Sequence, residues 1–99
     1  MEERNATMEN YRRIEVHYSG NVQGVGFRYR ARNTAQEYDL SGFVRNLDDG
    51  RVHLVAEGEK EDLISFLREI DQQMERYVRN KSVVWAKASN QFVAFDIRA

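Results

Sequence analysis

The sequence predicts an α+β sandwich in which two helices cover one face of a mostly antiparallel sheet. Three observations lead to this prediction. Several short segments alternate apolar with polar residues, as half-buried strands do. Two longer segments repeat their apolar residues with the period of an α-helix. The 99 residues suit one domain, because two domains would each be too small to bury a core.

The chain opens on a polar, aperiodic stretch over residues 1–12. We expect this stretch to be a flexible tail, followed by a single domain over residues 13–99. The first strand is predicted where Ile14, Val16 and Tyr18 alternate with polar residues. Such a strand buries one side against the rest of the domain and exposes the other.

A first helix is predicted from the end of a glycine-rich loop to about Asp39. Its less polar positions share one helical face, and its charged positions lie largely elsewhere. Gly42 then opens the next strand. The positions that share one helical face are Phe27, Ala31, Thr34, Ala35 and Tyr38.

A β-hairpin is predicted in the middle of the chain. Two β-prone runs, Phe43 to Leu47 and Arg51 to Glu57, flank Asp48-Asp49-Gly50. Aspartate followed by glycine between such runs is typical of a tight hairpin turn. The second helix is predicted to begin after Gly58, where acidic residues complement the helix dipole.

The apolar stripe of this second helix is followed by a segment whose secondary structure the sequence pattern does not determine. Either the helix continues toward Tyr77, or the connection over Gln72 to Lys81 is unusual. Two further strands are predicted beyond it, separated by a turn at Asn90-Gln91. The helical stripe is Leu63, Leu67, Ile70 and Met74, with Phe66 beside it, and the strand positions are Val83, Trp85, Val93, Phe95 and Ile97.

The predicted order is therefore strand, helix, strand, strand, helix, strand, with one extra strand at the C-terminal end. The simplest packing of this order is the ferredoxin-like β-α-β-β-α-β sandwich, in which both helices lie on one face of the sheet.

Composition excludes several classes of function. The formal net charge is −1, which argues against a polyanion-binding surface, so we expect no nucleic-acid partner. The absence of cysteine excludes thiol catalysis, disulfides and thiolate metal sites. No apolar stretch reaches the length of a membrane span, and residues 1–13 hold no signal-peptide core. We therefore expect a cytoplasmic protein without a membrane partner, and nothing in the sequence suggests an obligate dimer, so a monomer is expected.

The most informative stretch for function is residues 20–28, which hold three of the six glycines and end on Arg28. This stretch lies between the first strand and the first helix. Amide groups of a glycine-rich loop can converge on one point, and a helix N-terminus favours an anion there. The guanidinium of Arg28 adds a planar fork of donors that suits phosphate oxygens. The stretch therefore predicts an oxyanion-binding loop.

Other interpretations of the loop explain fewer of its residues. It lacks the Gly-Lys-Ser/Thr ending of a nucleotide P-loop. Gly24 and Gly26 begin a dinucleotide-binding pattern, but Tyr29 stands where the third glycine belongs. A tight strand–helix connection would explain the glycines alone but not the adjacent Arg28, whose usual alternative is a solvated surface position.

Two blocks of the chain resemble the signature blocks of the acylphosphatase family. The first is Val22 to Arg28, with the sequence VQGVGFR, and the second is Gly42 to Val52, with the sequence GFVRNLDDGRV. The closing Phe95 to Arg98 also resembles the family's last strand. The resemblance covers about Arg13 to Arg98. One departure is that many acylphosphatases carry Gly-Pro after the second helix, and Gln72 to Lys81 holds neither residue.

The resemblance implies hydrolysis of the mixed anhydride of a carboxylic acid and phosphate, so the expected partner is a small-molecule acyl phosphate. Water would attack phosphorus directly, and no cofactor is expected. Arg28 and Asn46 fall on the family's catalytic positions. The residues implied to bind the substrate phosphate are Gln23, Gly24, Val25, Gly26, Phe27 and Arg28.

Asn46 by itself would be interpreted as a turn residue at the end of a strand. The resemblance makes it the residue that positions the attacking water. A neutral amide cannot act as a general base, but its oxygen can accept a hydrogen bond from water and orient that water.

Other polar residues receive no catalytic role. No histidine–carboxylate spacing matches a known metal site, so no metal is expected. His17 and His53 are isolated on separate strands. Arg30 and Arg32 diverge from Arg28 on a helix, and we interpret them as solvated.

Two competing classes of function stay open. Acylphosphatase-like domains also occur within larger hydrogenase-maturation proteins, so the domain could be a non-catalytic module that binds phosphate or carbamoyl phosphate. The chain length favours a stand-alone protein. An RNA-binding domain shares the sheet topology, but it needs exposed aromatic residues in a strand of the type Lys/Arg-Gly-Phe-Gly-Phe, and Ser41 to Arg45 do not match that pattern. Turnover of an acyl phosphate distinguishes the enzyme from both, although the sequence does not name the physiological one.

Overall fold

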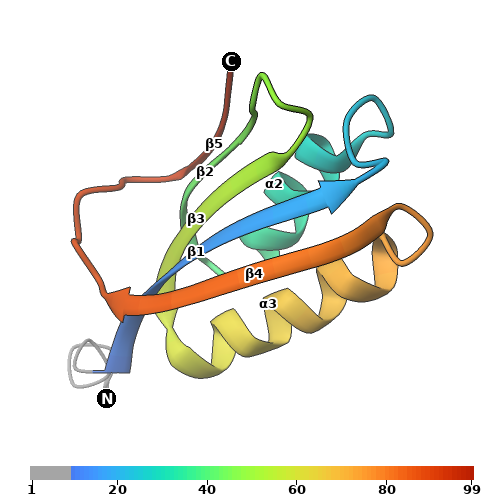
Figure 1. Ribbon diagram of the computed structural model, residues 1–99. Coiled ribbons are helices and arrows are strands. Elements are labelled where there is room, and N and C mark those ends of the chain that lie inside the picture. Colours follow the sequence, from blue (N-terminus) through green and yellow to red (C-terminus); the bar gives the residue numbers. More distant parts are fainter. Residues whose placement is uncertain (1–9) are drawn as a thin grey trace.

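The computed structural model describes residues 10–99, which form a five-stranded sheet covered on one face by two helices (Figure 1). The predicted α+β sandwich and its extra C-terminal strand are confirmed. The strands are β1 (Tyr11–Gly20), β2 (Ser41–Asn46), β3 (Val52–Glu59), β4 (Val78–Lys87) and β5 (Phe95–Arg98). The helices are α2 (Phe27–Glu37) and α3 (Lys60–Gln73).

The first strand begins earlier than predicted. Most of the expected tail, residues 1–12, lies outside the described residues, but its last two residues belong to β1. Tyr11 and Arg12 are incorporated because they pair antiparallel with Glu59 and Gly58 at the end of β3.

The sheet has the strand order β4-β1-β3-β2-β5. Neighbouring strands are antiparallel, except that β5 pairs parallel with β2. The register places Val16 opposite Leu54, on the side that faces the helices, and His17 opposite His53, on the uncovered side. The largest core side chains between the sheet and the helices are Ile14, Val16, Tyr18, Leu54, Leu63, Phe66, Ile70 and Met74. Among the described residues, no helix is long and apolar enough to cross a membrane.

The connection from α3 to β4 is a short turn over residues 74–77, so the helix does not continue to Tyr77. Met74 is fully buried, and its carbonyl accepts hydrogen bonds from the amides of Tyr77 at 2.9 Å and Val78 at 3.1 Å. The carbonyl of Tyr77 accepts from the amide of Asn21 at 2.9 Å. Gly20 has φ +121°, and a Cβ there would lie 2.5 Å from the Tyr77 oxygen. The turn thus packs against the start of the glycine-rich loop.

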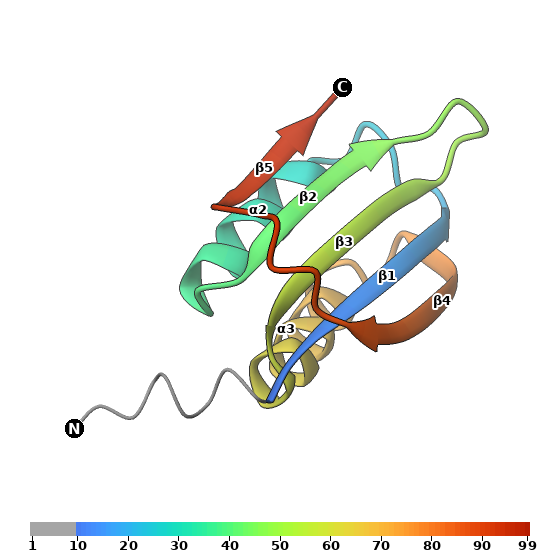
Figure 2. The same ribbon diagram turned by 90° about the vertical axis from the view of Figure 1, so that its left-hand side faces the viewer.

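The connection from β4 to β5, residues 88–94, crosses the face of the sheet that the helices leave uncovered. In Figure 2 it passes in front of β1 and β3 while both helices lie behind the sheet. This crossing carries the chain from one edge strand to the other. Val93 was predicted to belong to the last strand, but it precedes β5 and is 99% exposed. That part of the strand prediction is wrong because the pairing with β2 begins only at Phe95.

Candidate active site

The glycine-rich loop joins β1 to α2 through a backbone conformation that favours glycine. Gly24 and Gly26 have φ values of +79° and +80°, and a Cβ at either position would meet no atom within 4 Å. Glycine is therefore required for its conformation rather than for close packing. No side chain caps α2 at Gly26, so the amides of its first turn retain hydrogen-bonding capacity for an anion.

A pocket opens over this loop and reaches the end of β2. The loop is held in place by buried side chains on both sides of the glycines. Val22 is 0% exposed and Phe27 is 2% exposed. Among the residues that line it, Arg28 carries the only charged side chain. The lining consists of Val22, Gly24, Gly26, Phe27, Arg28, Tyr29 and Asn46.

The two predicted catalytic residues therefore share one pocket. Asn46 is the last residue of β2, where it pairs with Val52 of β3. Arg28 lies in the first turn of α2, and its Nη1 donates to the backbone oxygen of Arg98 at 3.3 Å. That bond uses one of the five guanidinium N–H donors and anchors the side chain to the end of β5.

Two of the predicted phosphate-binding residues direct their side chains elsewhere. Val25 packs against the hydrophobic core. Gln23 Nε2 donates to the backbone oxygens of Leu47 at 2.8 Å and Arg51 at 3.0 Å. Gln23 therefore ties the glycine-rich loop to the β2–β3 hairpin, directly after Asn46.

An exposed ion pair and a backbone hydrogen bond lie within the hairpin turn. Asp49 Oδ2 accepts from Arg51 Nε at 2.9 Å, and Asp49 Oδ1 accepts from the Arg51 amide at 3.1 Å. These hydrogen bonds, first of all the one from the backbone amide, lower the pKa of the Asp49 carboxyl. Asp49 thus forms hydrogen bonds within the turn, as predicted.

The two histidines are not isolated, and that prediction is wrong. The antiparallel register places His17 directly opposite His53, and their rings stack with centroids 4.6 Å apart. His53 Nε2 lies 2.8 Å from Glu15 Oε2, and this hydrogen bond lowers the pKa of Glu15. The ligand atoms of the three side chains lie within 4.8 Å of one another, on the sheet face opposite the helices.

This cluster does not present a formed metal site. Arg45 Nε donates to His53 Nδ1 at 3.1 Å, so the ring proton of His53 resides on Nε2 and is donated to Glu15. Neither nitrogen of His53 then offers a lone pair to a metal. The stacked rings are also nearly parallel, at 12°, so the nitrogen lone pairs of His17 and His53 do not converge.

Comparison with known proteins identifies the family. The family model of the acylphosphatases matches residues 14–97.

The chain belongs to the acylphosphatase family.

The acylphosphatase of Methanospirillum hungatei is 39% identical over 88 residues, which cover 88% of this chain and 97% of that protein. The acylphosphatase of Archaeoglobus fulgidus is 54% identical over 54 residues, or 54% of this chain and 61% of that protein. The structure of an acylphosphatase from Coxiella burnetii superimposes with a TM-score of 0.82 at 31% identity, covering 99% of this chain and 100% of that one. The resemblance found in the two signature blocks is thus confirmed for nearly the whole acylphosphatase domain.

Sequence reasoning missed the contacts that assemble this pocket. Neither the Gln23 side-chain bonds nor the Arg98 carbonyl that accepts from Arg28 is visible as a motif. Both contacts join segments more than 20 residues apart through backbone oxygens, which every residue has. The only available signal was the presence of Gln23 inside the first block and of Arg98 in the closing segment.

Proposed function

We propose that the protein hydrolyses the carboxyl–phosphate anhydride bond of acyl phosphates to a carboxylate and inorganic phosphate. The reaction is a metal-independent attack by a water that Asn46 positions. The observation that supports this most is that Arg28 and Asn46 line one pocket above two positive-φ glycines. Membership of the acylphosphatase family supports the reaction class.

In this proposal the phosphoryl group binds at the N-terminal end of α2. The amides of residues 23–28 and the guanidinium of Arg28 hold its oxygens. In the transition state of phosphoryl transfer, charge is spread over these oxygens, so donors that are already in place stabilise it and lower the barrier. The Arg28–Arg98 hydrogen bond supports this role, because it limits the positions that the guanidinium takes.

The attacking water is held at the other side of the pocket. The side-chain oxygen of Asn46 accepts a hydrogen bond from the water. This bond orients the water so that a lone pair of the water oxygen points toward phosphorus. A new P–O bond forms to the water, and the P–O bond to the acyl group breaks. One proton of the water passes to a phosphate oxygen of the substrate, and the other stays on the new P–OH group. The carboxylate leaves without a general acid, because it is weakly basic.

The proposal includes a cytoplasmic monomer that acts on a small molecule and has no nucleic-acid partner. The near-neutral net charge of −1 supports the last point.

The test is hydrolysis of benzoyl phosphate in excess EDTA. We expect the rate to be the same with and without the chelator. Loss of turnover in EDTA that a divalent cation restores would contradict the mechanism, and the absence of any turnover would favour a non-catalytic binding module.

A further inference from the structure

One buried carboxylate fixes the β4–β5 connection to the uncovered face of the sheet. Glu57, on β3, is 2% exposed. Its Oε2 accepts from the amide and the hydroxyl of Ser89, both at 2.8 Å, and its Oε1 accepts from the amide of Asn90 at 2.9 Å. Arg13 Nη1 lies 3.1 Å from Oε2. A buried charge persists only when donors surround it in this way.

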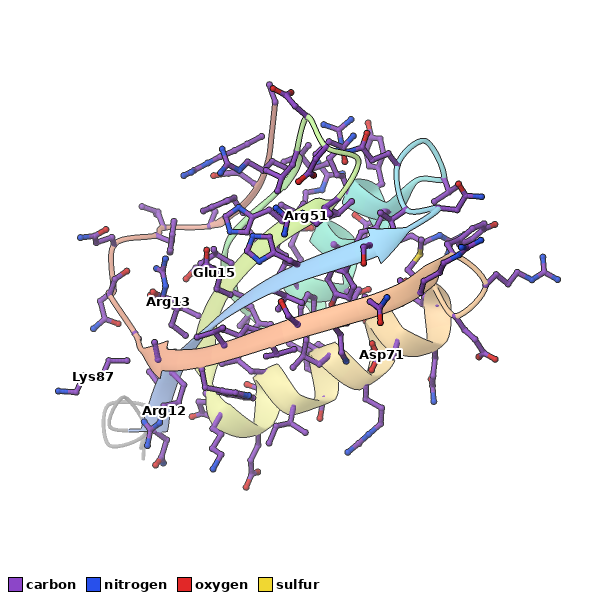
Figure 3. All side chains as sticks on the ribbon, viewed as in Figure 1. Arg12, Arg13, Glu15, Arg51, Asp71 and Lys87 are labelled. Carbon is purple, nitrogen blue, oxygen red and sulfur yellow. The ribbon has the colours of Figure 1, made fainter. Side chains whose placement is uncertain are left out.

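Arg13 completes this arrangement from the neighbouring strand β1. Figure 3 shows the side chain of Arg13 on the side of the sheet along which the connection runs. The guanidinium of Arg13 also lies 5.9 Å from the ring of Phe92, farther along the connection. Phe92 in turn lies 5.9 Å from Phe43 of β2, between ring centroids. The connection is thus held at its start by Glu57 and in its middle by an aromatic contact.

The connection leads directly to the strand that contacts Arg28. β5 has only four residues, and it pairs with β2 on one side alone. Its last residue, Arg98, stacks its guanidinium 4.1 Å from the ring of Phe43 and accepts from Arg28 Nη1 through its backbone oxygen. A short edge strand gains little from its own pairing, so the anchoring of the preceding segment decides how often it detaches.

We propose that Glu57 is a positioning residue for Arg28. By holding Ser89 and Asn90, it keeps β5 in the register that places the Arg98 oxygen against the Arg28 guanidinium. Glu57 does not line the pocket, so its effect on the reaction must pass through β5. The inference rests on the proposed function insofar as Arg28 is the residue that binds the phosphoryl group.

The test compares Glu57→Gln with Asp71→Asn. The glutamine keeps the shape of the side chain, but its NH₂ faces a donor at Ser89 or Asn90, and Arg13 loses its charge partner. The control removes an ion pair of 2.7 Å between Asp71 and Lys81, on the helix side of the molecule (Figure 3). We expect Glu57→Gln to weaken inorganic phosphate binding, measured by calorimetry, roughly 3- to 30-fold. Amide hydrogen exchange in β5 should accelerate in parallel, and Asp71→Asn should change neither quantity.

A double-mutant cycle identifies the route of the effect. Deletion of Arg98 and Ala99 removes the oxygen that anchors Arg28. In that background Glu57→Gln should weaken phosphate binding no further, because its effect is already lost. Additive losses would overturn the positioning role. If Glu57→Gln does not fold, Ser89→Ala removes a single contact of the carboxylate and should produce a smaller loss in the same direction.

The outcomes separate this inference from the proposed function. Suppose that the native protein hydrolyses benzoyl phosphate but that Glu57→Gln changes neither the affinity for phosphate nor amide exchange in β5. This result overturns the positioning role of Glu57 and leaves the proposed function intact. A protein that binds phosphate in a Glu57-dependent way but does not turn over benzoyl phosphate supports the inference and overturns the proposed function.

Discussion

Arg28 and Asn46 line the same pocket but differ in the chemistry that they offer to a ligand. Arg28 presents positively charged donors, whereas Asn46 presents a neutral amide at the end of β2. A charged donor suits the phosphoryl oxygens before and during the reaction. A neutral amide suits a water molecule. Substitutions at the two residues should therefore separate binding from turnover.

For Arg28, we expect alanine to abolish most activity and to weaken phosphate binding. Loss of one preorganised donor costs about 10²- to 10³-fold in rate, and a charged donor should cost at least that much. Arg28→Lys should fail as well, because an ammonium lacks the planar fork of a guanidinium. Steady-state kinetics with benzoyl phosphate and phosphate inhibition measure both effects. The matched control is Arg30→Ala, an exposed arginine of α2 that does not line the pocket. Near-native turnover of Arg28→Ala would place the anion site elsewhere.

For Asn46, we expect alanine to lower kcat strongly while phosphate inhibits about as well as before. Asn46→Asp adds an anion that repels the phosphoryl group, so it should weaken inhibition too. A residue that only supports the turn would tolerate aspartate, since aspartate and asparagine serve turns equally well. A folded Asn46→Asp protein with near-native kcat would mean that another group positions the water.

Among single residues, the sequence predicted those whose role follows from local pattern. Gly24 and Gly26 lie in the loop between a strand and a helix where their pattern placed them, and Asp49 forms the expected turn contacts. Glu57 and His53 were not predictable, because their partners come from other strands or from the β4–β5 connection. Alternation along one strand identifies its faces but not the residue opposite.

At the scale of elements, the loop after β1 and the β2–β3 hairpin act as one unit. The Gln23 amide group bridges the two carbonyls that close the hairpin, and those carbonyls also accept backbone amides of the turn. The Tyr77 carbonyl holds the other end of the loop through Asn21. The glycine-rich loop and Asn46 are thus held in place relative to each other.

We expect Gln23→Met to loosen this unit without emptying the pocket. Methionine has a similar length but donates no hydrogen bond, so two bonds are lost, each worth about 1 kcal/mol. Stability from urea unfolding should fall by about 1–2 kcal/mol, and kcat should fall because the water and the phosphoryl group are no longer aligned. Gln36→Met, at an exposed position of α2, is the control. An unchanged kcat in folded Gln23→Met would show that the hairpin keeps its position relative to the glycine-rich loop without the Gln23 bonds.

Element boundaries were predictable where a pattern is continuous and not where tertiary pairing decides. The helices and the hairpin agree with the sequence because periodicity and an Asp-Gly turn determine them. The end of α3 depends on the buried Met74, and the start of β5 depends on pairing with β2. Neither dependence is visible from local composition.

At the scale of the whole molecule, Glu57 makes the free energy of unfolding depend on pH. Burial by itself would raise the pKa of its carboxyl, but hydrogen bonds from Ser89, Asn90 and Arg13 outweigh burial and lower the pKa. A carboxyl whose pKa is lower in the folded state stabilises the fold above its unfolded pKa of about 4.3. That stabilisation is lost as the pH falls through the lower, folded value.

We therefore expect the difference in unfolding free energy between the native protein and Glu57→Gln to be largest near neutral pH and to shrink below about pH 4. Urea unfolding at a series of pH values measures this difference. Asp71→Asn, which removes a more exposed carboxylate, should show a smaller dependence. A difference that stays constant down to acid pH would mean that Glu57 contributes by shape and not by charge.

The most direct test of the whole account is hydrolysis of benzoyl phosphate in water labelled with the heavy oxygen isotope, in the presence of EDTA. Attack on phosphorus by a water held at Asn46 places the label in the inorganic phosphate. Mass spectrometry of both products should find one labelled oxygen in phosphate and none in benzoate, and Asn46→Ala should form labelled phosphate far more slowly. Label in the benzoate would mean attack at the carbonyl carbon and would contradict the mechanism.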